Sequence, residues 1–474
     1  MRALAALKDR SQPRSKPVSR SVFLQVASIV ALAGVCVAAT ACSPAASPQP
    51  ARSPVAQKWF DRAQAAYRTV DVEDAQDAVA EALRAAPDDP DVKLLAANLA
   101  LARLDFEEAK RLTGGLTDPR ALSVRGRALW YAGDVRNAGI VLETLLRDPE
   151  VHDPWAKAIS KLANLGAGRT PYRASGNIVA VAEMPHVRGA ALIVPVEVDG
   201  DQGLALVATG TAEVVLDSAV RKEPSWVSIR IGDGVEFGDV PAVTQDLSGL
   251  SRQLSAPIKA LLGVNFLRHA NPTFDYEAHQ FVVRRFLPPR PPTATDVPIF
   301  YIRGGGMVMR SALKSDNAAS HASLMIDSSM LFPLTLDEEG WRKAGVSTAR
   351  LTPVPEEPSL KQGTVPLLRV GQFDLPQVAG VLGKEIATLE TSLGLDIDGV
   401  VGAGLLAGFR VTLGDAGRVM WIEEEVVADT GPTPTEAASG APDGSPAPPA
   451  QPTAPGATGS ALPSIAPPIA PPAR

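Results

Sequence analysis

Few residues of this 474-residue chain have types and spacings that could carry out chemistry. The two cysteines, Cys36 and Cys42, both lie near the N-terminus, so the rest of the chain offers no thiolate nucleophile and no thiolate metal site. The histidines show no spacing typical of zinc ligands: His152, His186, His269, His279 and His321. We therefore expect no metal and no cofactor. What remains is a carboxylate in a turn, Asp327-Ser328-Ser329, which directly follows an apolar run.

A similar turn without a carboxylate, Ala208-Thr209-Gly210, follows the apolar run 204–207. Both turns lie in a region, from about Asn177 onward, where alternating apolar residues punctuated by Gly and Asp indicate strands and hairpins. A Pro-rich segment, Phe286–Pro298, divides this region into two halves. Two pairs of matching glycines, one of each pair in either half, are separated by the same offset along the chain, which indicates a duplication: Gly232 with Gly371, and Gly263 with Gly402.

The two halves resemble the retropepsin and pepsin clan of aspartic peptidases, over about residues 177–423. In the first half, a tight turn at Asp199-Gly200-Asp201 joins two strands, and the second strand runs into Ala208-Thr209-Gly210. The second motif of the clan, two apolar residues followed by Gly, is similar to Leu261-Leu262-Gly263 and to Val400-Val401-Gly402. The resemblance implies an all-β, bilobal double barrel, with lobe 1 at residues 177–286 and lobe 2 at 297–425.

In the peptidases of this clan each lobe supplies one Asp, and the two carboxylates share a proton. The ionised carboxylate acts as general base, and the protonated one donates to the substrate. Carried over to this chain, the resemblance gives Asp327 as the candidate catalytic carboxylate, followed by Ser328 and by Ser329 in the place of Gly. In the first turn Thr209 and Gly210 are kept, but Ala208 replaces the Asp. Because the two carboxylates act as a unit, we expect catalysis to fall by orders of magnitude.

Three alternatives concern Asp327 and its missing partner. In another register, Asp217-Ser218-Ala219 would supply the first-lobe carboxylate, although Asp217 and Asp337 look like caps of the helices that follow them. Two copies of Asp327 could also meet in a homodimer. Finally, Asp327 could be structural, hydrogen-bonding its own turn as isolated Asp-Ser turns usually do.

Residues 55–170 have a helical pattern that resembles about three tetratricopeptide-type (TPR) repeats. The resemblance depends on small residues at helix contacts and on Pro after the second helix of a pair. These residues are Ala63, Ala66, Ala75, Val79, Ala82, Pro87, Phe106, Ala109, Gly126, Leu129, Ala138, Leu142, Leu145 and Pro149. The alternative is a plain helical bundle. Because stacked repeats present a concave surface, this region predicts a protein partner.

The N-terminal residues 1–41 have the order of a secretory signal, in which basic residues precede an apolar stretch, Val22–Ala41. Cys42 follows small residues and resembles the lipidated cysteine of bacterial lipoproteins; the alternative is an uncleaved anchor helix. Residues 42–54 then read as a linker, and the Pro- and Ala-rich tail 429–474 as disordered. We therefore expect an exported protein of the bacterial cell envelope that is anchored in the membrane through a lipid.

The net charge of −6, without a sustained basic stripe, indicates no nucleic-acid partner. The chain is thus expected to be multidomain, with an α-helical TPR-like region followed by the all-β double barrel. The function that fits best is binding of extended peptide or protein segments without efficient proteolysis. The alternatives are an active aspartic endopeptidase, using Asp327 with Asp217 or a dimer partner, and an envelope scaffold.

Overall fold

The computed structural model describes residues 52–185, 190–315, 318–355 and 357–424. Helices form the first part and strands dominate from Arg173 onward, so the predicted change from helices to strands is confirmed. The expected signal, Cys42, most of the linker and the C-terminal tail lie outside the described residues. Within those residues, no helix is both long enough and apolar enough to cross a bilayer.

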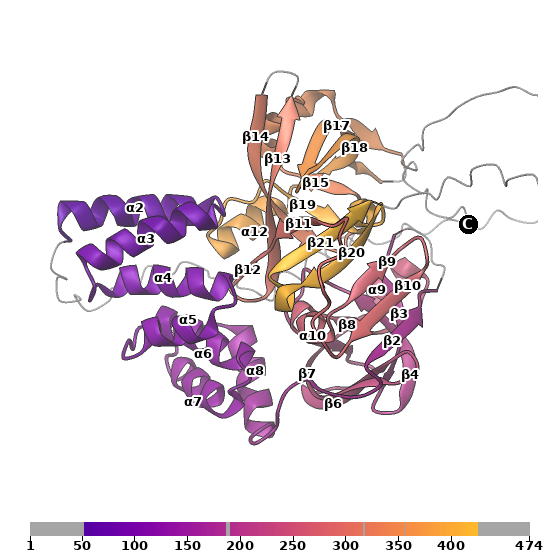
Figure 1. Cartoon of the computed structure of the whole chain (residues 1–474), viewed down its shortest axis with the longest axis horizontal. Coiled ribbons are helices and arrows are strands. Elements are labelled where there is room, and N and C mark those ends of the chain that lie inside the picture. Colours follow the sequence, from indigo (N-terminus) through magenta and orange to yellow (C-terminus); the bar gives the residue numbers. More distant parts are fainter. Residues whose placement is uncertain (1–51, 186–189, 316–317, 356, 425–474) are drawn as a thin grey trace, which may run out of the picture.

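The helical region consists of helices that pack as consecutive antiparallel neighbours (Figure 1). They are α2 (Pro54–Arg68), α3 (Val72–Ala85), α4 (Pro90–Ala102), α5 (Phe106–Thr113), α6 (Pro119–Tyr131), α7 (Val135–Leu146) and α8 (Pro154–Leu165). An Asp side chain caps each of α3–α8, which satisfies a free N–H of the first turn: Asp71, Asp89, Asp105, Asp118, Asp134 and Asp153. At Gly126 a Cβ atom would lie 2.5 Å from Leu142 Cδ2, so any larger residue here would displace the Leu142 side chain that packs between α6 and α7. That these hairpins are TPR repeats stays a prediction.

Lobe 1 contains a sheet in the order β1-β7-β5-β8-β4-β3-β6, closed by pairing of β6 with β7. Its strands are β1 (Arg173–Gly176), β3 (Ile193–Val198), β4 (Asp201–Val207), β5 (Val214–Asp217), β6 (Ser225–Ile231), β7 (Val235–Gln245) and β8 (Ile258–Leu262). Two short helices, α9 (Ser248–Leu254) and α10 (Val264–Ala270), flank β8. The predicted tight turn joins β3 to β4, with φ of 49° at Asp199 and 93° at Gly200.

Lobe 2 contains a sheet in the order β12-β13-β14-β19-β15-β18-β17-β16, closed by pairing of β13 with β17. Its strands are β12 (Phe300–Ile302), β13 (Gly306–Ser315), β14 (Ala318–Asp327), β15 (Leu334–Leu336), β16 (Thr352–Val354), β17 (Glu357–Val370), β18 (Phe373–Leu382) and β19 (Gly399–Gly402). Its helices are α11 (Glu338–Lys343), α12 (Ile386–Leu393) and α13 (Ala403–Leu406), with 3₁₀ turns at Thr348–Arg350 (η2) and Asp415–Gly417 (η3).

The two lobes repeat one pattern of strand pairing. In lobe 1, β4 runs parallel to β8, β5 is antiparallel to β8, and β5 is parallel to β7. In lobe 2, β14 and β19, β15 and β19, and β15 and β18 pair in the same three ways. The predicted duplication is therefore confirmed at the level of topology.

A third sheet, the bridging sheet, takes strands from both halves of the chain, in the order β11-β21-β20-β9-β10-β2. Its strands are β2 (Val179–Glu183), β9 (Thr273–Asp275), β10 (Gln280–Arg284), β11 (Thr295–Pro298), β20 (Phe409–Gly414) and β21 (Val419–Glu424). At its centre Thr273 pairs with Thr412, which is separated from it by the same offset as the matching glycines, and their hydroxyl oxygens are 2.8 Å apart. Equivalent residues thus face each other across an approximate two-fold axis between the lobes.

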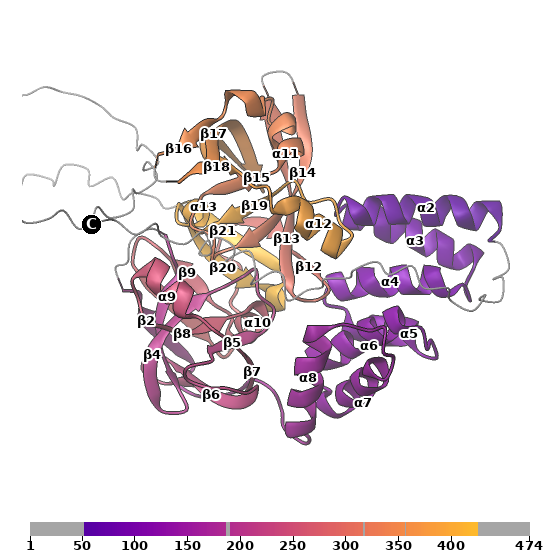
Figure 2. The same cartoon turned by 180° about the vertical axis from the view of Figure 1, so that it is seen from behind.

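The helical region lies along one side of both lobes (Figures 1 and 2). On lobe 2, the Ser323 hydroxyl donates to the carbonyl of Thr69 at 2.7 Å, and Arg310 forms a salt bridge with Asp71 at 2.8 Å. On lobe 1, the Trp226 indole donates to the carbonyl of Leu162 at 2.8 Å. The helices therefore bridge the two lobes.

One predicted element differs between the lobes. Asp337 caps α11 as expected, but residues 218–220 after Asp217 form a turn, not a helix. The lobe 1 chain is shorter here, because the segment from Asp217 to Gly232 is less than half as long as its counterpart from Asp337 to Gly371. The additional length of lobe 2 contains α11, η2 and the β16–β17 hairpin.

Candidate functional site

The two turns that were singled out in the sequence meet where the lobes touch. The Thr209 hydroxyl accepts from the Ser328 backbone N–H at 2.9 Å and donates to the Ile326 carbonyl at 3.0 Å. In return, the Ser328 hydroxyl accepts from the Thr209 N–H at 3.1 Å and donates to the Val207 carbonyl at 2.7 Å. Each turn lies at the end of a strand that is paired in parallel with a neighbour: β4 with β8, and β14 with β19. The two turns therefore occupy equivalent places on either side of the approximate two-fold axis between the lobes.

Asp327 lies at this junction and is 6 % exposed. Its Oδ1 accepts from the Ser329 N–H at 2.9 Å and from the Ser329 hydroxyl at 2.6 Å. Gly210 lies against the carboxyl group, because a Cβ atom on Gly210 would be 2.5 Å from Asp327 Cγ. Burial raises the pKa of Asp327, while hydrogen bonds from Ser329 and Gly210 oppose the shift. No charged side chain of the described residues contributes to this shift.

Ala208 occupies the position in lobe 1 that is equivalent to Asp327. It is fully buried and belongs to an apolar cluster with Leu206, Val215 and Leu261. The first-lobe position therefore offers a methyl group among apolar side chains. The turn keeps its geometry through Thr209 and Gly210, but it supplies no group that could share a proton with Asp327.

The structure does not bring Asp217 to the junction. Asp217 ends β5, where it pairs with Gln245, and its Oδ1 accepts from the N–H groups of Ala219 at 3.1 Å and Leu247 at 3.4 Å. These bonds hold a local turn of lobe 1. Ser329, by contrast, does lie at the junction, where it hydrogen-bonds Asp327.

A buried acid beside the junction was missed by the sequence reasoning. Glu213 is three residues after Gly210 and 4 % exposed, and its Oε1 accepts from the Trp155 indole N–H of α8 at 3.2 Å. Burial raises the pKa of Glu213. Nothing in the local sequence distinguishes Glu213 from a surface Glu, because its burial depends on helices that come much earlier in the chain.

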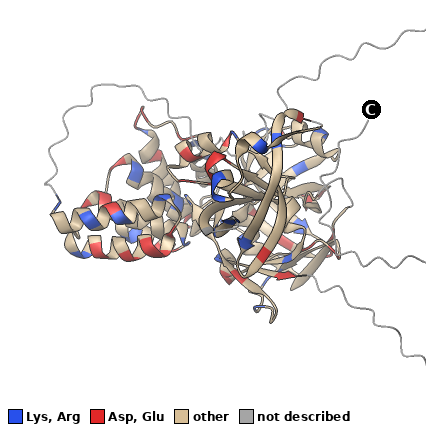
Figure 3. Ribbon diagram, turned by 90° about the horizontal axis from the view of Figure 1, so that it is seen from above, with Lys and Arg blue, Asp and Glu red and all other residues tan. Residues whose placement is uncertain are grey.

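This arrangement allows limited chemistry. A single buried carboxyl group can donate or accept one hydrogen bond at the junction, but activation of a water between two carboxylates needs the second acid. Among the described residues, no group of three or more His, Cys, Asp or Glu side chains could hold a metal ion. Acidic and basic side chains are interspersed on the face seen in Figure 3.

Comparisons with known proteins add two likenesses. No protein-family model matches the chain, and no curated protein matches it. One similar solved structure is a retropepsin-like aspartic protease from Rickettsia conorii, with 16 % identity and a TM-score of 0.21, covering 27 % of this chain and 90 % of that one. Another is an aspartic proteinase from Irpex lacteus, with 10 % identity and a TM-score of 0.34, covering 52 % of this chain and 97 % of that one. The two lobes themselves are established by the strand pairing within this chain.

Proposed function

We propose that the β region is an aspartic-peptidase-like module that binds extended peptide or protein segments between its lobes without efficient proteolysis. One observation carries the proposal: Thr209 and Ser328 hold the two turns together reciprocally, yet only one of the two equivalent positions bears a carboxylate. The two turns are held in contact, as the halves of a two-lobed site would be. Ala208, however, leaves the site with one carboxylate where two would be needed.

The features of Asp327 support a binding role. Its carboxyl group is held by Ser329 and Gly210, and burial raises its pKa, so the neutral form, which can donate a hydrogen bond to a peptide carbonyl, persists to higher pH than in an exposed Asp. An extended chain can also pair its backbone with exposed strand edges, which requires no catalytic group. The helical region would supply a second protein-binding surface, as TPR-type repeats do.

The test is cleavage of casein, an unstructured protein, by the purified chain between acidic and neutral pH. Wild type, Asp327→Ala and Ala208→Asp are compared, with casein binding measured in parallel. We expect binding without cleavage for wild type, and cleavage by Ala208→Asp that disappears in the double variant with Asp327→Ala. Cleavage by wild type that depends on Asp327 would overturn the proposal in favour of an active peptidase. Absence of casein binding would overturn it in favour of a scaffold.

We further propose that the protein acts in the bacterial cell envelope, exported and lipid-anchored through Cys42. The order of basic, apolar and small residues before Cys42 supports this location. Metabolic labelling with a fatty acid, compared between wild type and Cys42→Ser, tests it. Label on wild type alone is the expected result, and label on neither chain would contradict the anchor.

A further inference from the structure

Helices α6 and α8 cover the part of lobe 1 that directly follows the junction. Trp155 of α8 bonds Glu213, while Trp130 and Tyr131 of α6 lie beside the same carboxylate. The lobe 2 residue at the equivalent distance from its turn, Phe332, is only partly buried. Glu213 is buried where these helices pack against lobe 1.

The helices contact lobe 1 at Trp226, near the start of β6. The Trp226 ring lies 5.9 Å from that of Trp130, and a Cβ atom on Gly166 would be 2.1 Å from it, so the ring fits against α8 only because residue 166 is Gly. The equivalent position on β17, at the same offset as the matching glycines, is Val365, which follows the β16–β17 hairpin of lobe 2. Lobe 1 lacks this hairpin, and the helical region contacts the strand at the corresponding place.

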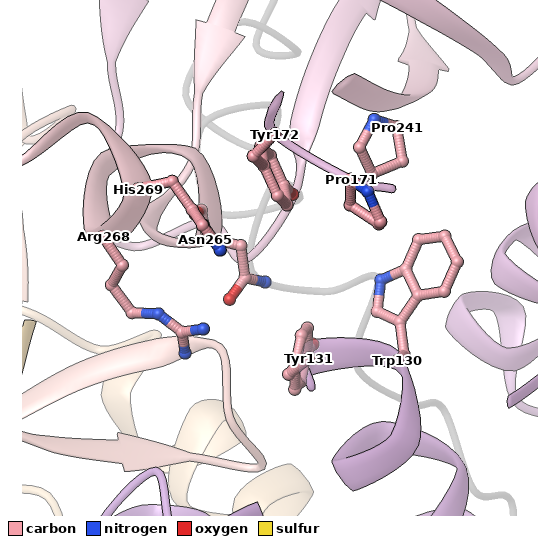
Figure 4. Close-up of a pocket in the computed structure, with 8 residues that line it drawn as sticks. All are labelled: Trp130, Tyr131, Pro171, Tyr172, Pro241, Asn265, Arg268 and His269. Atoms are coloured by element: carbon pink, nitrogen blue, oxygen red, sulfur yellow. The ribbon is translucent and has the colours of Figure 1, made fainter. Parts of the chain in front are cut away.

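The covered face of lobe 1 is polar, and much of it is unpaired. We define this covered face as Thr211, Glu213, Asn265 and Arg268. Among the described residues, no hydrogen-bond partner is found for Thr211 Oγ1, Glu213 Oε2, Asn265 Oδ1 and Nδ2, and Arg268 Nη1. The Tyr172 hydroxyl, which lies beside this face, is buried and unpaired as well, and the buried Tyr131 hydroxyl lies near the side chains of Asn265 and Glu213. Figure 4 shows Asn265, Arg268, Tyr131 and Tyr172 around a common space.

That space is too small to satisfy these groups. The cavity between Tyr131, Tyr172, Asn265 and Arg268 has a volume of about 10 Å³, which is room for roughly one water molecule. A water molecule makes about two to four hydrogen bonds, so several polar atoms stay unpaired while the helices are docked. Each of them destabilises the docked state relative to a state in which water satisfies it.

In protein interiors, nearly all buried polar groups form hydrogen bonds. Single buried atoms such as Thr335 Oγ1 and Trp341 Nε1 of lobe 2 are unpaired as well, but on the covered face several unpaired atoms lie together where a separate region of the chain rests on them. The donors and acceptors of the covered face would be satisfied by water, or by the alternating N–H and C=O groups of an extended peptide, once the helices moved away.

We propose that α6 and α8 form a removable cover over this polar face, and that docking of the helices and binding of a peptide at the junction exclude each other. The inference rests on the proposed function and adds its regulation: the docked helices weaken binding of a peptide, which wild type binds through the open fraction of its molecules. The contacts of Thr69 and Asp71 with lobe 2, at the ends of α2 and α3, would keep the helical region attached to lobe 2 when α6 and α8 move away from lobe 1.

The experiment compares full-length wild type with Trp155→Phe, which keeps an aromatic ring but removes the hydrogen bond to Glu213. Trp59→Phe, on α2, is the matched control. Binding of labelled casein is measured by anisotropy, and amide hydrogen exchange is followed in residues 124–131 and 264–271 with and without casein. We expect casein to bind Trp155→Phe about three- to tenfold more tightly than wild type, because loss of one hydrogen bond favours the open state.

Bound casein should also speed exchange in residues 124–131 of wild type, since these residues leave lobe 1. Equal casein affinity for all three chains, with exchange unchanged on binding, would overturn the cover while leaving the proposed function intact. If no chain binds casein, the proposed function fails. The removable cover is then tested by hydrogen exchange of the ligand-free chain alone. There, exchange in both segments that is faster than global unfolding supports the cover, and exchange only through global unfolding overturns it.

Discussion

Thr209 and Ser328 exchange hydrogen bonds across the boundary between the lobes, each hydroxyl serving the other turn as donor and acceptor at once. The residues are 119 positions apart and both are almost fully buried. Because every bond has its counterpart across the axis, neither turn can shift without breaking bonds of the other. This pair therefore fixes the distance between the lobes at the junction, independently of any catalytic group.

The first prediction concerns this pair. Thr209→Val is nearly isosteric but removes the hydrogen bonds of the hydroxyl and leaves the buried Ser328 N–H unpaired, so it should cost about 2–4 kcal/mol of stability. Thr244→Val, at a surface hydroxyl, should stay within about 0.5 kcal/mol of wild type. Urea unfolding of the three chains measures this. Similar stabilities for Thr209→Val and Thr244→Val would show that the reciprocal bonds do not hold the lobes together.

The second prediction is a pH dependence that arises from Asp327. Since burial raises the pKa of its carboxyl group above that of the unfolded chain, its contribution to stability is fully present at low pH and is lost as pH rises through the folded-state pKa. Asp327→Asn cannot ionise and keeps an oxygen to accept from Ser329. The melting temperature of this variant relative to wild type should therefore increase from pH 4 to pH 7.

The matched control for this titration is Thr244→Val, which changes no ionisable group. Its melting temperature relative to wild type should stay constant between pH 4 and pH 7. If the difference in melting temperature between Asp327→Asn and wild type is constant over the pH range, ionisation of Asp327 does not destabilise the folded chain.

The third prediction tests the close approach of Gly210 to Asp327. In Gly210→Ala the new methyl group would lie 2.5 Å from Asp327 Cγ, so the carboxyl group or the turn must move, at a cost of about 1–3 kcal/mol. Gly408→Ala is the control, because its nearest neighbour, the Leu405 carbonyl oxygen, would lie at an ordinary 3.6 Å. Thermal unfolding measures both variants, and equal stability would contradict the packing of the two turns.

The fourth prediction concerns the joint between the helical region and lobe 1. Trp226→Ala removes the ring between Trp130 and Gly166 and should destabilise the chain by about 2–4 kcal/mol. Trp226→Phe loses only the bond to the Leu162 carbonyl and part of the ring, so it should cost about half as much. Calorimetry should resolve separate unfolding transitions for the helical region and the lobes in Trp226→Ala. A single transition, unchanged from wild type, would show that the contact at Trp226 does not couple the unfolding of the two regions.

Much of the fold could be predicted because it depends on local patterns. Helical periodicity with small residues indicated the helices, and alternation with Gly-rich turns such as Asp199-Gly200 indicated the hairpins. The constant offset between matching glycines predicted a duplication, and the pairing of Thr273 with Thr412 is its structural form. The turn after Asp217 was predicted incorrectly as a helix, because the capping pattern does not reveal that lobe 1 is shorter there.

The sequence by itself determined that the chain has two related turns, one with Asp327 and one with Ala208, since residue identity needs no fold. Only the tertiary structure decided that these turns meet, that Asp217 lies elsewhere, and that Glu213 and Arg268 are buried beneath the helices. The physical reason is range. A local sequence pattern depends on residues that are neighbours along one strand or helix. Burial and pairing between distant parts of the chain depend on how separate elements pack, which a local pattern does not determine.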